Sequence, residues 1–194
     1  MKIAFDENMP RALVRTFRTL ARDKGFQRTF GKIQIVSAKD YTPKPDDEDY
    51  LPGNDVPWLT RYRKSRGRVF ISGDTAMPDV PHELKAIEEL GLIAFFMPPR
   101  WNNWRFPRKS ALIFAWLERI IEHAKIARPG TLHRVPNDWR EEATLFVIPS
   151  PGPLKLKLHE HPVRAPKPAA QRKRRVRGTE RAPDLFPPIE ARDG

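Results

Sequence analysis

Short apolar segments that alternate with helical patterns are the feature that most constrains the fold of this chain. Three of them are Lys2 to Phe5, Arg68 to Ser72 and Leu92 to Phe96, and Ile33 to Val36 is a fourth. Strands that are apolar along their whole length are buried on both faces, which is typical of parallel sheets covered by helices on either side. The sequence therefore predicts an α/β fold, a doubly wound three-layer αβα sandwich with a mainly parallel sheet.

Helix boundaries follow from proline, acidic residues and glycine at the ends of the amphipathic segments. The first helix is expected to begin near Pro10 and to close at Lys24-Gly25, and the second to follow Asp55. A third is expected from Pro81 to Gly91, and a longer one from about Arg108 to Lys125. In the first helix, the apolar stripe leaves four arginines to face water or a ligand: Arg11, Arg15, Arg18 and Arg22.

Composition changes near residue 149, which predicts two parts. Residues 1–148 are expected to form the domain, with 144–148 as a candidate last strand. Residues 149–194 are rich in proline and basic residues and lack periodic apolar positions, so we expect a flexible tail. The N-terminus is acidic and no apolar run approaches the roughly 18 residues of a membrane span, which predicts a soluble cytoplasmic protein without membrane contact.

Charge and the lack of cysteine limit the chemistry. The formal net charge of +12 favours a polyanionic partner such as nucleic acid or an acidic protein, without choosing between them. The chain has no cysteine, so thiol nucleophiles and thiolate zinc sites are excluded and any metal must be held by oxygen or imidazole.

Acidic residues stand where two of the apolar segments end. Asp6 follows the first and Asp74 follows the segment from Arg68 to Ser72, so a parallel sheet would bring both to its carboxyl edge. Asp55, at the start of a helix, can point into the same crevice. Such oxygen ligands suit Mg²⁺ or Mn²⁺, which can orient and deprotonate a water for attack on a phosphodiester.

Each acid also has a purely structural interpretation. Asp55 would cap its helix in any protein, and Gly73-Asp74-Thr75 is also a turn sequence. Asp6 is not needed to cap the first helix, because Asn8 is available for that position. Two further acids near this edge are weaker candidates for a fourth ligand, namely Asp79 and Glu83.

A loop that interleaves aromatic and basic residues is a candidate RNA contact. Its residues are Arg100, Trp101, Trp104 and Arg105, which would stack on unpaired bases and bind phosphates. The alternative is that the tryptophans fill the edge of the core. The basic cluster over residues 172–177 would hold RNA electrostatically or lie in a solvated tail.

Several ordered segments together resemble the PIN-like domains of VapC-type toxins from bacterial toxin-antitoxin systems. These are MKIAFDENMP, NDVPWL, VFISGDTAM, PHELKAIEELGLIAFF and PPRWNNWRFPRKSAL, over roughly residues 1–140. The resemblance implies a parallel αβα sandwich, metal-dependent endoribonuclease activity and neutralisation by an antitoxin protein, with a homodimer as a further expectation. By position, it implies catalytic acids at Asp6, Asp55 and Asp74, which would bind Mg²⁺ or Mn²⁺ with help from Glu7. The fourth acid usual in the family has no clear counterpart in residues 75–81.

Two other functions compete with an RNA-cleaving toxin. The missing fourth acid favours a PIN-like module with weakened catalysis that binds RNA or protein. A phosphoacceptor receiver domain would also place acids after a strand, but the lysine expected after a later strand is not evident.

Overall fold

The computed structural model describes residues 1–138 and 144–149 of the 194-residue chain. Its strands are β1 (Lys2–Phe5), β2 (Gln34–Ser37), β3 (Val69–Ser72), β4 (Ile93–Phe96), β5 (Leu132–Arg134) and β6 (Phe146–Ile148). Its α-helices are α1 (Arg11–Leu20), α2 (Lys24–Phe30), α3 (Val56–Lys64), α4 (Pro81–Glu89) and α5 (Phe106–Ile126). Three short 3-10 helices are η1 (Ala38–Asp40), η2 (Met77–Asp79) and η3 (Trp101–Asn103).

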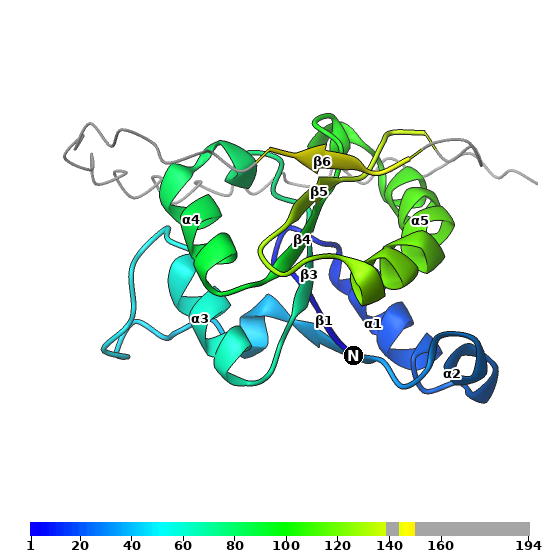
Figure 1. Ribbon diagram of the computed structural model, residues 1–194, viewed down its shortest axis with the longest axis horizontal. Helices are drawn as coiled ribbons and strands as arrows, with labels where there is room; N and C mark the ends of the chain where they lie inside the picture. The colour runs from blue at the N-terminus through cyan, green and yellow to red at the C-terminus, as the bar shows by residue number, and fades with distance from the viewer. Residues whose placement is uncertain (139–143, 150–194) are drawn as a thin grey trace, which may run out of the picture. The chain divides into compact units, whose positions relative to one another are not determined.

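The six strands form one sheet in the order β2-β1-β3-β4-β5-β6, in which the first five are parallel and β6 is antiparallel to β5. Helices α3 and α4 lie on one face of the sheet, and α1, α2 and α5 lie on the other (Figure 1). This arrangement confirms the predicted αβα sandwich with a mainly parallel sheet. Because β1 and β3 are neighbours and parallel, the residues that follow them lie at the same edge.

Alternation of side chains along the strands produces two cores. Ile3 and Phe5 of β1 face the core beneath α1 and α5, whereas Ala4 faces the core beneath α3 and α4. The same division applies along β3, where Val69 and Ile71 face one side and Phe70 the other. All residues of β3 and β4 are buried, which explains their continuous apolar sequence.

Two elements differ from the predictions. The first helix ends at Leu20, and Lys24 opens a separate helix, α2, because the Asp23 side chain accepts a hydrogen bond from the backbone N–H of Phe26. Strand β5 was not predicted, since three residues are too few to show a period. The candidate strand at 144–148 is confirmed over β6.

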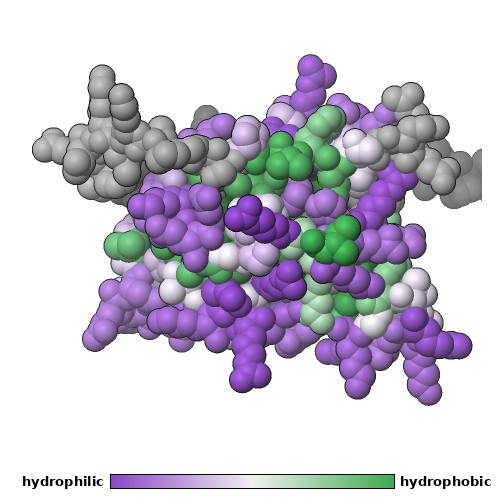
Figure 2. Space-filling model, viewed as in Figure 1, coloured by the Kyte–Doolittle hydropathy of each residue, from purple (hydrophilic) through white to green (hydrophobic). Residues whose placement is uncertain are grey.

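Hydrophilic side chains dominate the face of the molecule seen in Figure 2, and hydrophobic ones form small separate patches there. Within the described part of the chain, no helix is both long enough and apolar enough to span a membrane. The tail predicted for 149–194 lies outside the described residues except for Pro149, and its boundary stays a prediction.

Candidate functional site

Asp6 joins the ends of β1 and β3. Its Oδ1 accepts hydrogen bonds from the backbone N–H groups of Asn8 at 3.0 Å and Gly73 at 3.1 Å. Its Oδ2 accepts from the Ser72 hydroxyl and, at 3.2 Å, from the backbone N–H of Asp74. A carboxylate has about four lone-pair positions, so these donors satisfy Asp6 fully. Asp6 therefore fixes the turn that presents Asp74.

Burial dominates the ionisation of Asp6, whose residue surface is only 5% exposed. Loss of hydration raises the pKa of the Asp6 carboxyl to about 6, although the hydrogen bonds from Ser72, Gly73 and Asp74 act in the opposite direction. The negative charge of Asp55 adds to the rise. A carboxyl that titrates this close to neutral pH is characteristic of functional sites.

Asp55 stands at the N-cap position of α3 but does not cap it. Its side chain makes no capping hydrogen bond, and the N–H of Val56 bonds instead to the side chain of Asn54 at 2.9 Å. Asp55 Oδ1 accepts a hydrogen bond from the indole N–H of Trp58 at 2.9 Å. The structural interpretation of Asp55 as a helix cap is therefore wrong.

Electrostatic coupling relates Asp55 to the other acids. Burial is the main cause that raises the pKa of the Asp55 carboxyl, the Trp58 hydrogen bond opposes the rise, and the charges of Asp74 and Glu7 reinforce it. Asp55 in turn raises the pKa of Asp6. The fold thus brings together the four acids predicted as ligands, Asp6, Glu7, Asp55 and Asp74, which we call the acid cluster.

Free oxygens in the acid cluster belong to its less buried members. Asp74 Oδ1 accepts from the N–H of Ala76 at 2.8 Å, and Glu7 is exposed. Among the described residues, no hydrogen bond reaches Oδ2 of Asp55 or of Asp74. Of the two weaker candidates, Asp79 lies exposed in η2 and Glu83 lies buried in the first turn of α4.

The chemistry of these donors fits a hard divalent cation. Carboxylate oxygens are the ligands that Mg²⁺ and Mn²⁺ prefer, and a cation would stabilise the ionised forms of Asp6 and Asp55, which burial and, to a smaller degree, mutual repulsion disfavour. Within residues 1–138 and 144–149, no group of three acids or histidines is close enough to hold an ion by itself. Mg²⁺ commonly binds through one or two carboxylates with several waters, so Asp55 and Asp74 suffice as direct ligands.

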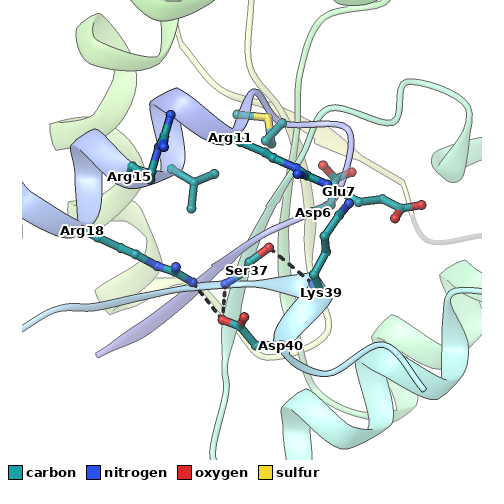
Figure 3. Close-up of a pocket in the computed structure, with 10 residues that line it drawn as sticks. Asp6, Glu7, Arg11, Arg15, Arg18, Ser37, Lys39 and Asp40 are labelled. Atoms are coloured by element: carbon teal, nitrogen blue, oxygen red, sulfur yellow. Dashed lines mark hydrogen bonds and ion pairs between the residues drawn. The ribbon is translucent and has the colours of Figure 1, made fainter. Parts of the chain in front are cut away.

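A pocket with a volume of about 440 Å³ opens beside the acid cluster. Asp6 and Glu7 line one end of it, the arginines of α1 line a wall, and Ser37, Lys39 and Asp40 line the opposite wall (Figure 3). Arg18 and Asp40 form an ion pair at 2.8 Å across the far end. The pocket is therefore acidic at one end and mainly basic along its length.

The loop predicted to contact RNA does not present all of its aromatic rings for stacking on bases. Trp101 is completely buried and packs into the core beneath α1 and α5, so its ring is closed to a base, and the core interpretation is correct for it. Trp104 is half-buried and lies 4.0 Å from the guanidinium of Arg108. Arg100 and Arg105 are exposed, and their contact with RNA, like that of Trp104, stays a prediction.

Sequence reasoning missed three supporting residues of this site. Ser72 ends β3 and Trp58 lies in α3, and each donates a hydrogen bond to an acid of the cluster. Lys39 follows β2 in η1 and reaches the pocket from the far side. A polar residue at the end of a buried strand, such as Ser72, was the one available signal.

Comparison with known proteins identifies the family of the chain. Residues 1–99, about half of the chain, match the family model described as PIN like domain. The match runs from β1 through β4 and includes every member of the acid cluster. No curated protein and no solved structure gives a significant match.

Proposed function

The chain belongs to the PIN-like domain family, and from this premise we propose that it is a metal-dependent endoribonuclease, the toxin of a toxin-antitoxin pair. PIN-like domains are often nucleases. The observation that carries the proposal is the acid cluster, in which four carboxylates from three separate segments lie near one another at the carboxyl edge of the sheet. The net charge of +12 suits an RNA substrate.

Each acid has a distinct part in the proposed reaction. Asp55 and Asp74 would hold Mg²⁺ or Mn²⁺, and Glu7 would contribute charge from the exposed rim. The ion, when bound, would activate water and offset the charge that develops on the phosphodiester. Asp6 positions the Ser72–Asp74 turn, and with a pKa of about 6 its carboxyl is mostly ionised at neutral pH.

The test is cleavage of a single-stranded RNA by purified protein with Mg²⁺ or Mn²⁺. We expect cleavage that stops with chelator and falls at least a hundredfold in Asp74→Asn, which keeps the Oδ1 acceptor for Ala76. Asp46→Asn is the matched control, since it removes an exposed acid outside the cluster. Absence of cleavage with either ion, or equal activity in Asp74→Asn and Asp46→Asn, would reject the proposal.

The toxin role has its own test in cells. Induced expression is expected to arrest growth, and co-expression of a cognate antitoxin is expected to restore it. Asp74→Asn should be harmless at the same protein level. Arrest by Asp74→Asn as strong as by the wild type would separate toxicity from RNA cleavage and count against the toxin mechanism.

A second candidate is a PIN-like module that binds RNA or a protein and has lost most of its catalysis. It is favoured by the fact that no three acidic or histidine side chains of the described residues close around a metal position. Salt-sensitive RNA binding without any product, in Mg²⁺ and in Mn²⁺, would favour it over the nuclease.

A further inference from the structure

The pocket beside the acid cluster has cations that no acid neutralises by direct contact. Arg11 and Arg15 project from α1, and Lys39 projects from η1 on the facing wall (Figure 3). All three are exposed, and within the described residues none of them forms an ion pair or a side-chain hydrogen bond. Arginine and lysine side chains held along one groove next to a set of acids call for an anionic ligand.

The far end of the pocket differs, because its cation is already neutralised. Arg18 pairs with Asp40 at 2.8 Å and also donates to the carbonyl of Ile35 at 3.3 Å. Asp40 is held in turn by the N–H of Ser37 at 3.0 Å, in a capping box of η1. This ion pair closes the groove, so the cations available to a ligand are Arg11, Arg15 and Lys39, which we call the groove cations.

Spacing along α1 indicates what kind of anion fits. Arg11 and Arg15 are one turn apart, which separates them by about 6 Å along the helix axis. Neighbouring phosphates of an extended strand can match this spacing. The floor between them includes Met9 and Val14, whose apolar surface tolerates the face of a sugar or base.

We propose that the groove cations bind consecutive phosphates of a single RNA strand as it leaves the acid cluster. This inference rests on the proposed function and specifies its substrate as single-stranded RNA, oriented along α1. Arg11 and Lys39 hold the phosphate nearest the acids, and Arg15 holds the next. The contacts go to phosphates, so they position the strand without reading its sequence. The simple alternative is that these cations only balance the charge of Asp6 and Glu7.

The test measures RNA binding rather than cleavage, in an Asp74→Asn background that leaves the substrate intact. The probe is a fluorescein-labelled single-stranded RNA of mixed sequence, with Mg²⁺ present and salt varied. We expect Arg15→Gln with Lys39→Gln to raise Kd about tenfold near physiological salt. The slope of log K against log salt should become less negative by about 1.4, or about 0.7 for each lost phosphate contact of a single strand.

A matched double variant removes the same charge elsewhere. Arg22→Gln with Arg28→Gln changes exposed arginines that do not line the groove, and it should keep the wild-type slope to within about 0.3. A blunt-ended RNA duplex should bind the groove variant and this control equally. Equal binding of single-stranded RNA by both variants would overturn the inference. A protein that binds as expected but never cleaves would reject the proposed function alone.

Discussion

Trp58 is the residue through which the core adjusts the ionisation of the site. Its ring is buried beneath α3, and its N–H donates to Asp55 at 2.9 Å. That hydrogen bond lowers a pKa that burial and the neighbouring acids raise. A side chain with an apolar ring and one donor can therefore serve packing and chemistry together.

Replacing Trp58 by phenylalanine should move the acid limb of the pH dependence of RNA cleavage to higher pH. The change removes the donor that stabilises the Asp55 carboxylate, so the pKa of Asp55 rises further and the ionised form is lost earlier as pH falls. Cleavage rates between pH 5 and 8 would measure the shift. Trp116→Phe is the control, because it deletes another buried indole donor, to the Asp138 carbonyl, away from the acids. An unchanged limb in Trp58→Phe would refute this role.

His133 provides a second pH-dependent residue, here for stability. Its side chain is 3% exposed, stacks on Phe95 at 5.2 Å between ring centroids and lies 4.4 Å from the ring of His123. Burial, with the charge of His123 as a smaller cause, lowers the pKa of His133 from 6.5 to about 4. Its Nδ1 has no hydrogen-bond partner among residues 1–138 and 144–149, which fits a neutral ring in the folded protein.

The free energy of unfolding should fall as pH decreases from about 6.5 to about 4. Between these values the unfolded chain binds a proton at His133 that the folded protein does not, so acid favours unfolding, by up to about 3 kcal/mol. Urea denaturation at a series of pH values would measure the slope. His133→Phe should remove this part of the slope, and the difference between the two proteins isolates it from the titrating carboxyls. Identical slopes would contradict the prediction.

One hydroxyl of helix α3 bonds directly to two strands of the sheet. The Tyr62 hydroxyl lies 2.9 Å from the carbonyl oxygen of Lys2 in β1 and 2.6 Å from that of Val69 in β3. Because Asp55 precedes the same helix, this attachment also sets where Asp55 stands relative to Asp6 and Asp74. The Tyr62 ring packs so closely on Gly67 that a Cβ there would approach it to 2.4 Å.

Tyr62→Phe should destabilise the protein by about 1–2 kcal/mol, because it removes the single O–H donor that the two carbonyl oxygens share. Thermal unfolding followed by circular dichroism would detect the loss as a lower Tm. Tyr41→Phe is the matched variant, since the Tyr41 ring contacts Tyr62 but its hydroxyl has no hydrogen bond among the described residues. Its Tm should stay within about 1 °C of the wild type. Equal losses of Tm in both variants would mean that the hydrogen bonds of the Tyr62 hydroxyl do not stabilise the protein.

The helices and strands were predictable from the sequence where the residues that mark them lie within the element or next to it. Continuous apolar runs mark β3 and β4, and Gly91, with φ of 63°, ends its helix as expected. Helix α2 was missed because Lys24-Gly25 resembles the end of a helix. The structure shows that Asp23 caps a second helix at this point. The bonds from Ser72, Gly73 and Asp74 to Asp6 were not predictable, since they depend on the pairing of β1 with β3 across 66 to 68 residues.

At the scale of the whole molecule, the acid cluster is expected to reduce the stability of the protein when no cation is bound and to provide a binding site for a cation. The chain carries a net charge of +12, yet the fold places four acids together at one edge and a row of basic residues beside them. Burial, reinforced by repulsion between the acids, raises the pKa of Asp6 and of Asp55 in the folded protein, which means that their ionised forms disfavour folding at neutral pH.

Removing one charge from the cluster should therefore stabilise the protein without metal and abolish its response to metal. Asp55→Asn and Asp74→Asn keep the Oδ1 acceptors used by Trp58 and Ala76, so in chelator their Tm should exceed that of the wild type by about 1–3 °C. Mn²⁺ at ten times its Kd should stabilise the wild type by about 1.4 kcal/mol and these variants by much less. Asp6→Asn should do the opposite and lower Tm, because an amide NH₂ would face the donors that Asp6 now accepts. Asp46→Asn controls for loss of an exposed acid. If Asp55→Asn and Asp74→Asn unfold below the wild type in chelator, or gain as much from Mn²⁺, the cluster is not a cation site.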